Sequence, residues 1–428
     1  MKVYSIFKIL SRCEMPSKVS DSNIIASVDV GSYKIACVIA RVVGQNEIEI
    51  LGAGQVLSEG VKRGTIVNIQ EASQGIQKAV EEAEIMAGVQ IDSLYIGLSG
   101  VYCEGINTKS VVAVNNKERE ITYSEVKRAI DSATERVVPL NKEVIHVIPQ
   151  QYSVDNQDGI KNPLGMNGTR LEVSLRVINA NVTQLQNLIK AVSKANFGIS
   201  DFILGSVAEG ELLLSEEEKD LGVVLVDIGG GTTEVVGYYN GSVWFNGAIP
   251  IGGVDITSDI STIFKTTFQQ SEKIKKLYGH AFPPSVDEDE TIEVQMINKR
   301  VKTIKRVGLA KVIEARVEEI FLEVRRMLEN SGMYESTTAG IVLTGGSSLL
   351  PGIDGVAENV FNLPCRIGFV ENIGGISDAV KSPVFAKSVG LVYYPLLKSN
   401  IIVQDSSSQK PKFFKKIKDF INNFFFGE

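Results

Sequence analysis

The chain has 428 residues, of which 44% are hydrophobic, and a formal net charge of −7. This length favours two to four structural units over one small domain, and no apolar run reaches the ~18 residues that span a bilayer. Two histidines, and four cysteines without a CxxC spacing, argue against a His- or Cys-based centre and against a disulfide framework. Both ends are basic and the body is acidic, which is not typical of a nucleic-acid-binding protein.

The first residues, Met1–Ser20, resemble a signal peptide only in part. Lys8 interrupts their apolar run, and no small-residue cleavage site follows. We expect residues 1–22 to form an N-terminal arm that is disordered or touches a membrane surface. Met15 offers a second start of translation, and the sequence leaves these alternatives open.

The stretch Ile24–Ala40 reads as two apolar strands joined by a short polar turn. The backbone N–H groups of a glycine-containing turn suit phosphate, and a carboxylate at its edge suits hydrated Mg²⁺. This pattern predicts that Asp29 faces a metal ion. The predicted phosphate-binding residues here are Gly31, Ser32, Tyr33 and Lys34.

A helix and a strand are predicted next. Asn68 is a typical N-cap and Gly88 a typical stop, which gives a helix over Asn68–Ala87. Leu94–Leu98 is apolar enough for a short buried strand.

Residues 103–181 read as a separate α+β unit without a phosphate turn of its own. Thr122 and Glu125 form a capping box that opens a helix to about Val137. The predicted strands are Val111–Val114, Val144–Ile148, Tyr152–Val154 and Leu171–Ile178. The unit is either structural or a contact surface for another protein, and we favour contact.

Two helices follow, over Val182–Asn196 and Gly205–Leu214. Glu209 lies on the second helix, directly before the next strand. It either reaches the metal ion through a water molecule or is a solvated helix charge, and the sequence leaves both open.

The stretch Val223–Thr233, VVLVDIGGGTT, repeats the strand–Asp–Gly–hydroxyl pattern. Asp227 ends the strand as a second candidate metal ligand. The predicted phosphate-binding residues are Gly229, Gly230, Gly231, Thr232 and Thr233. Asn240-Gly241 predicts a type I′ hairpin. No Gly-Lys-Ser/Thr follows, which excludes a P-loop, and the hairpin excludes a dinucleotide fingerprint. Alone, the motif is equally typical of a tight turn.

A third glycine turn, in Ile341–Ser348, follows another buried-strand pattern. It would let a nucleoside lie against the backbone. Glu272 and Lys275 share one face of a helix over Gln270–Tyr278, either as an exposed ion pair or as ligand contacts. The predicted nucleoside-binding residues of the glycine turn are Gly345, Gly346 and Ser347. We also expect a polar loop over Pro283–Thr291, a long helix over Ile304–Asn330 and a helix around Gly355–Phe361.

The C-terminal segment Lys410–Glu428 follows a predicted linker, 398–409. At 3.6 residues per turn its apolar side chains fall on one arc and its lysines on the other. This pattern favours an in-plane membrane helix over a terminal helix packed on the core. The predicted membrane-facing residues are Phe413, Phe414, Ile417, Phe420, Ile421, Phe424, Phe425, Lys415, Lys416 and Lys418.

The two strand–Asp–Gly units suggest a duplicated α/β fold that clamps a ligand between its halves. Together with the TGGSS turn, in this order, they resemble the actin-like ATPase superfamily with its ribonuclease H-like fold. Local matches over Ile148–Val173, Val224–Val243 and Ala339–Gly352 resemble the FtsA family of bacterial cell-division proteins. The resemblance covers roughly Asn23–Tyr394 and the amphipathic tail.

The resemblance implies a domain plan. A first actin-like half spans 23–102, 182–215 and 375–397, and an SHS2-like α+β insertion spans 103–181. A second half spans 216–254 and 333–374 and carries a subdomain at 255–332. The linker 398–409 and the amphipathic helix 410–428 complete the chain.

The resemblance also implies a role. It implies ATP and Mg²⁺ as cofactors, self-assembly into an actin-like filament, and at most weak ATPase activity with no assigned catalytic residue. By position, Glu272 and Lys275 match the adenine and ribose contacts of actin-like relatives, so the resemblance adds them to the adenosine-binding residues Gly345, Gly346 and Ser347. Residues 255–332 would bind the C-terminal peptide of the tubulin-like protein FtsZ, and the insertion would recruit later divisome membrane proteins. The tail would bind anionic phospholipid at the cytoplasmic face of the bacterial inner membrane, at the division site.

Three alternatives share the fold. A sugar or acetate kinase predicts a catalytic carboxylate facing a substrate pocket and no amphipathic tail. A chaperone predicts a β-sandwich domain after the ATPase, for which the chain has no room. An FtsA-like pilus-assembly ATPase shares the insertion and lacks the Phe/Lys tail, so the tail favours cell division.

Overall fold

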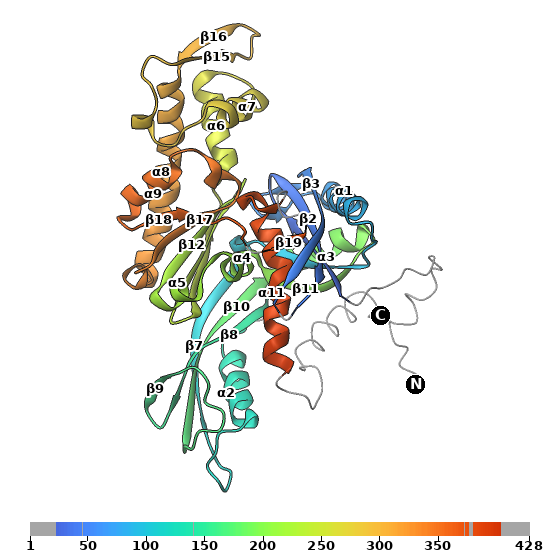
Figure 1. The fold of residues 1–428 in the computed structure, drawn as a ribbon, viewed down its shortest axis with the longest axis vertical. Helices are drawn as coiled ribbons and strands as arrows, with labels where there is room; N and C mark the ends of the chain where they lie inside the picture. Colours follow the sequence, from blue (N-terminus) through green and yellow to red (C-terminus); the bar gives the residue numbers. More distant parts are fainter. Residues whose placement is uncertain (1–22, 45, 140, 372, 376–379, 404–428) are drawn as a thin grey trace.

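The computed structural model describes residues 23–44, 46–139, 141–371, 373–375 and 380–403, so the predicted arm and amphipathic tail lie outside it. Figure 1 shows two sheets side by side, with one small subdomain at each end of the long axis. The first sheet has the strand order β11-β6-β1-β2-β3-β19. Its strands are β1 (Ile24–Val30), β2 (Lys34–Val42), β3 (Ile48–Leu57), β6 (Ser93–Leu98), β11 (Gly198–Leu204) and β19 (Gly374–Gly375).

The second sheet repeats the plan of the first, with the order β14-β13-β12-β17-β18. Its strands are β12 (Val223–Ile228), β13 (Thr233–Tyr239), β14 (Ser242–Ile249), β17 (Gly340–Thr344) and β18 (Cys365–Ile367). In each sheet an antiparallel three-strand meander begins with the Asp-bearing strand, which also pairs in parallel with a later strand. Asn240 and Gly241 both have positive φ at the β13–β14 turn, as a type I′ hairpin requires. The predicted duplication is confirmed.

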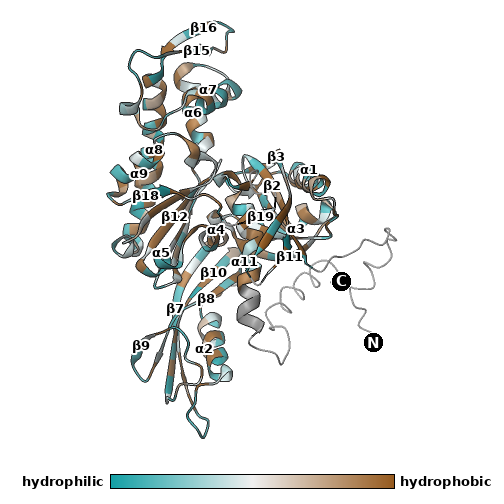
Figure 2. Cartoon of the chain, viewed as in Figure 1, coloured by the Kyte–Doolittle hydropathy of each residue, from teal (hydrophilic) through white to brown (hydrophobic). Residues whose placement is uncertain are grey.

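Helices cover the sheets and fill the space between them. They are α1 (Ile69–Ala87), α3 (Val182–Lys194), α4 (Gly205–Leu213), α5 (Glu216–Leu221) and α11 (Ala386–Val403). Helix α1 begins at the predicted cap, where the Asn68 side chain accepts from the backbone N–H groups of Gln70 and Glu71, and it ends at Gly88 in the left-handed region. Helices α4 and α11 lie between the sheets, where a Cβ at Gly390 would stand 2.6 Å from the Ala208 carbonyl oxygen. In Figure 2 hydrophobic residues follow the sheets and the inner helix faces.

The unit at one end of the molecule is the predicted insertion. Its sheet has the order β7-β10-β8-β9 and packs against one helix over a core of its own. The elements are β7 (Cys103–Ala113), α2 (Tyr123–Glu135), β8 (Lys142–Val154), β9 (Gln157–Ile160) and β10 (Arg170–Asn181). The two predicted strands within 144–154 are one strand, because β8 continues along β10 through bulges.

The unit at the opposite end grows out of the second sheet and shares its core. It contains α6 (Gly253–Phe264), α7 (Phe268–Tyr278), β15 (Thr291–Gln295), β16 (Val301–Lys305) and α8 (Arg306–Ser331), while α9 (Ile353–Phe361) packs on α8 nearer the sheet. The predicted long helix is a single helix of 26 residues. The β15–β16 hairpin directly after the predicted polar loop was not foreseen.

A buried arginine joins the insertion to the second half. Arg176 on β10 donates from Nε to Asn246 Oδ1 at 2.9 Å, and from one terminal nitrogen to Asn107 Oδ1 and the Trp244 carbonyl, both at 2.8 Å. Only 4% of Arg176 is exposed, and burial lowers its pKa to about 10. The insertion therefore belongs to the first half by chain connection and contacts the second half through this cluster.

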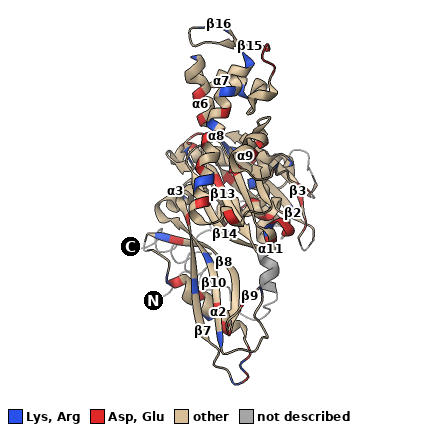
Figure 3. Cartoon of the chain, turned by 90° about the vertical axis from the view of Figure 1, so that its left-hand side faces the viewer, with Lys and Arg blue, Asp and Glu red and all other residues tan. Residues whose placement is uncertain are grey.

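Two features bear on the ends of the chain. Helix α11 continues to Val403, so the predicted linker, 398–409, begins inside a helix, which corrects its start. No helix in the described part of the chain is long and apolar enough to cross a membrane. In the view of Figure 3, acidic and basic residues are interspersed along the elements.

Candidate nucleotide-binding site

A cavity of about 440 Å³ lies between the two halves and takes its walls from both sheets. Most of the residues predicted from the three glycine turns line it together. They are Asp29, Gly31, Ser32, Tyr33, Lys34, Glu209, Asp227, Gly229, Gly230, Thr232, Glu272, Lys275, Gly345, Gly346 and Ser347. Segments that are far apart in the sequence therefore converge on one space.

The two Asp-Gly turns have the same hydrogen bond. The Gly31 N–H donates to the Lys34 carbonyl at 3.1 Å, and the Gly229 N–H donates to the Thr232 carbonyl at 2.9 Å. The turns meet across the cavity, where a Cβ at Gly230 would lie 2.3 Å from Tyr33 Cβ. Such closeness requires glycine at 230.

Two predicted phosphate contacts, Gly231 and Thr233, are not part of the cavity wall. Thr233 is the first residue of β13, and its fully buried hydroxyl donates to the Ile251 carbonyl at 2.9 Å. A Cβ at Gly231 would lie 2.8 Å from Ser32 Cβ, so this residue packs the two turns together. The Thr233 hydroxyl is therefore satisfied within the second half, and Gly231 lies between the two turns and not in the cavity wall.

The floor of the cavity holds a cluster of buried charges. Burial raises the pKa of Asp29, and burial together with Asp227 raises the pKa of Glu209 well above its ordinary value. Burial likewise lowers the pKa of Lys34, whose ammonium group donates to the Val384 carbonyl. Glu209 is 1% exposed, so it is not a solvated helix charge.

Sequence reasoning missed two residues of this cluster. Lys387, at the start of α11, has its Nζ 2.7 Å from Asp227 Oδ2 and 3.3 Å from Glu234 Oε2. Burial would lower the pKa of Lys387, but Asp227 and Glu234 outweigh it and raise that pKa well above its ordinary value. Glu234 also accepts from Ser99 Oγ of the other half at 2.8 Å. The sequence feature that could have indicated Lys387 and Glu234 is a single charged residue within an otherwise apolar stretch.

Another part of the cavity wall is formed by α7 and the third glycine turn. Lys275 Nζ lies 2.7 Å from Glu272 Oε2, and their side chains are only 10% and 13% exposed, so the pair is not a surface ion pair. Thr257 Oγ1 donates to Glu272 Oε2 at 2.6 Å. Gly345 has φ +83°, and a Cβ there would stand 2.1 Å from Asp227 Oδ1. Position 345 therefore requires glycine, because the third turn packs directly against Asp227.

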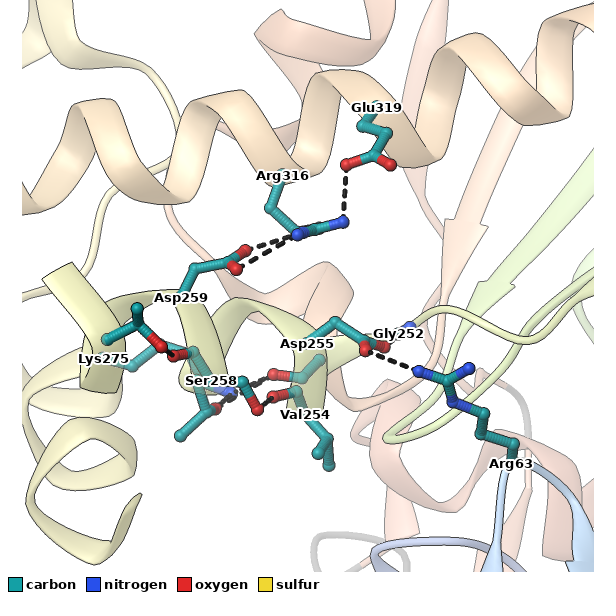
Figure 4. A network of polar contacts seen from close by, with 12 residues as sticks. Arg63, Gly252, Val254, Asp255, Ser258, Asp259, Lys275, Arg316 and Glu319 are labelled. Atoms are coloured by element: carbon teal, nitrogen blue, oxygen red, sulfur yellow. Dashed lines mark hydrogen bonds and ion pairs between the residues drawn. The ribbon is translucent and has the colours of Figure 1, made fainter. Parts of the chain in front are cut away.

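Polar contacts also link the two halves beside the cavity. Arg63 lies 3.4 Å from Asp255 Oδ1 at the start of α6, and Lys276 Nζ lies 3.1 Å from the Tyr33 hydroxyl. Figure 4 shows Arg63 reaching toward Asp255, while Arg316 of α8 makes a two-pronged contact with Asp259 of α6. The Arg63 contact therefore joins the first half to α6 of the second half, and Arg316 holds α6 to α8.

The carboxylates that line the cavity determine whether a metal ion can bind there. Among the residues that the structure describes, no three His, Cys, Asp or Glu side chains converge to hold one by themselves. Mg²⁺ bound beside phosphate needs only one or two carboxylates, and it keeps several water molecules. The buried Glu209 Oε2 has no hydrogen-bond partner among the described residues, so it offers a free acceptor for such a water. The site thus fits a metal ion brought by phosphate.

Comparisons with known structures agree with the fold. The PilM–PilN type IV pilus biogenesis complex matches with a TM-score of 0.62 at 17% identity, over 87% of this chain and 98% of that one. MreB5 of Spiroplasma citri, solved with ADP, matches with a TM-score of 0.51 at 14% identity, over 89% and 98%. At these identities the likeness concerns the fold alone, and it confirms the actin-like architecture.

Sequence comparisons go further. The family model for cell division protein FtsA matches residues 224–390, and the model for the SHS2 domain inserted in FtsA matches residues 100–179. FtsA of Borreliella burgdorferi is 38% identical over 95% of this chain and 99% of its own length. FtsA of Bacillus subtilis (36%, over 88% and 84%) and of Escherichia coli K12 (33%, over 88% and 91%) are similar too. The chain belongs to the FtsA family of actin-like cell division proteins.

Proposed function

We propose that the cavity binds ATP with Mg²⁺ and that the nucleotide holds the two halves together for assembly. The observation that carries this is the convergence of three glycine turns and the side chains of Lys34, Lys275 and Lys387 on one space. Gly31 to Lys34, Gly229, Gly230 and Thr232 would bind the phosphates through backbone N–H groups and Lys34. Glu272, Lys275, Gly345, Gly346 and Ser347 would contact the adenosine.

Asp29, Asp227 and, through water, Glu209 would hold the Mg²⁺ ion, which supplies charge neutralisation beside the phosphates. We propose at most a slow ATPase. Glu209 is assigned to the metal-bound water, and we name no residue of the chain as a catalytic base. The nucleotide would then act mainly as a structural link.

We further propose that the protein assembles into actin-like filaments on the cytoplasmic face of the inner membrane at the division site. Residues 410–428 would bind anionic phospholipid, and each copy would bind weakly, so a filament would bind far more tightly through avidity. The insertion would contact later divisome membrane proteins. Family membership and the sequence pattern of the tail support this proposal.

Residues 255–332 are proposed to bind the C-terminal peptide of FtsZ. This subdomain exposes apolar side chains, among them Ile263 (57% exposed), away from the cavity walls. Ile263→Glu should weaken FtsZ peptide binding in a fluorescence anisotropy titration and leave ATP binding unchanged. Leu221→Glu, at an equally exposed apolar position outside the subdomain (58%), is the matched control. Equal peptide binding by a chain lacking 255–332 would refute the assignment.

A further inference from the structure

Lys387 is a cation fixed among the carboxylates of the cavity floor. It is the second residue of α11, and its side chain is 14% exposed. Its Nζ lies 2.7 Å from Asp227 Oδ2 and 3.3 Å from Glu234 Oε2, and these two side chains are 6% and 1% exposed. The ammonium group therefore lies where a carboxylate-bound cation would.

The position of Lys387 is unfavourable for a positive charge in two respects. The first turn of a helix carries the positive end of its dipole, which repels a cation. Burial of an ammonium group carries a further desolvation cost. Asp227 and Glu234 compensate for both, and a Cβ at Gly205 would lie 2.7 Å from Lys387 Cδ, so α4 leaves room for the lysine stem.

The charges around this lysine explain what it could do for a nucleotide. Asp29, Glu209, Asp227 and Glu234 are four carboxyl groups facing two lysines, Lys34 and Lys387. The polyphosphate of ATP adds several negative charges to this cluster. Without a cation between phosphate and carboxylates, their repulsion in a partly dry cavity would oppose binding.

We propose that Lys387 is a tethered counter-cation of the nucleotide site, so that ATP binds this protein with little dependence on Mg²⁺. The inference rests on the proposed function of the cavity. It leaves room for a metal ion, because Glu209 Oε2 has no hydrogen-bond partner among the described residues and remains open to a metal-bound water. Lys387 offsets part of the negative charge of this cluster, and the metal ion would add to a positive charge that is already in place.

The test is the dissociation constant of ATP for the full chain by isothermal titration calorimetry, in Mg²⁺ and in EDTA. We expect the two values to differ by about tenfold or less in the wild type, and by about a hundredfold or more in Lys387→Met. Lys387→Arg keeps the charge and should restore the small ratio. Lys311→Met, an exposed lysine on α8, should leave the ratio at the wild-type value.

Each outcome decides the inference. A wild type that loses ATP in EDTA as fully as Lys387→Met does would overturn it. The wild-type ratio alone suffices if Lys387→Met fails to fold, which circular dichroism would reveal: a ratio near a hundredfold would then overturn the inference. Absence of ATP binding by the folded wild type in both buffers would overturn the proposed function itself, and this inference with it.

Discussion

Gly230 is the residue at which the two phosphate turns come closest. A Cβ there would lie 2.3 Å from Tyr33 Cβ and 3.3 Å from Tyr33 N, so a side chain would force the halves apart. Overpacking of this kind typically costs about 1–3 kcal/mol. Gly230→Val should therefore lower the affinity for ATP by about a hundredfold or more in calorimetric titration, since the same site must also admit phosphate.

The matched control is Gly308→Val on α8, where a Cβ meets nothing within 4 Å. It should bind ATP as the wild type does. Unchanged binding by Gly230→Val would mean that the phosphates lie elsewhere.

At the residue scale the sequence predicts one class of site residue well and another poorly. Asp29, Asp227 and the glycines beside them are recognisable because a strand, a carboxylate and a turn follow one another directly. Lys387 and Glu234 are different. Each is a single charge in an apolar element, and its partner lies on another element, so the cluster forms only when the fold brings Lys387 of α11 beside Asp227 and Glu234.

At the scale of elements, the contact of β10 with β14 depends on Arg176. Arg176→Met would leave Asn246 Oδ1 without this donor in a buried interface, while Asn107 Oδ1 still accepts from Gln150 and the Trp244 carbonyl still accepts from Asn107. An unsatisfied buried acceptor costs about 1–3 kcal/mol. We expect hydrogen exchange of the β10 and β14 amides to quicken, by an amount equal to about 1–3 kcal/mol of opening free energy.

Arg170→Met on the same strand is the control. The Arg170 side chain is 49% exposed and pairs with Glu172 at the surface, where ion pairs contribute little. Similar exchange in both variants would mean that the insertion is held by other contacts.

Helix α2 depends on its capping box. The hydrogen bond from Thr122 Oγ1 to the Glu125 carboxylate, with that from the Thr122 N–H, holds the pKa of Glu125 below its ordinary value of 4.5. A lowered pKa gives stability that is present above pH 4.5 and is lost as the pH falls through the folded value. Glu125→Gln should therefore show a smaller fall in melting temperature than the wild type between about pH 6 and about pH 3. An equal fall in both proteins would contradict this assignment.

Elements with strong local signals were predicted and others were not. Helix α1 has a cap, a stop and regular apolar spacing, and it was placed correctly. The β15–β16 hairpin was missed because its strands are five residues each and follow an acidic run. Only Ile292, Val294 and Ile304 are buried in it, so its alternation is short and its pairing depends on packing against α7 and α8.

At the scale of the molecule, the halves meet at the cavity, where the phosphate turns come together, and the insertion meets the second half at the Arg176 cluster. We expect a change in the separation of the halves at the cavity to act on the Arg176 contacts too. Assembly that requires one separation would then depend on nucleotide, which is the core of the proposed function.

The C-terminal segment Lys410–Glu428 is proposed to bind the membrane, and its sequence predicts how substitutions in it act. Seven apolar side chains, five of them Phe, fall on one helical arc, and five Lys accompany them in Lys410–Glu428. Each Lys near an anionic leaflet contributes about 1 kcal/mol. Phe420→Glu places a charge in the middle of that arc and should release the protein from vesicles with ATP binding intact. High salt should weaken the wild type by screening the lysines.

The most direct test of the central claim is co-sedimentation of FtsZ with anionic liposomes in the presence of the full chain and ATP. We predict that FtsZ pellets with the wild type and ATP, and that it stays in the supernatant without ATP, with Phe420→Glu, or with a chain that lacks Lys410–Glu428. FtsZ that pellets equally with the truncated chain, or equally without nucleotide, would contradict the claim that an ATP-dependent assembly anchors it to the membrane through the tail.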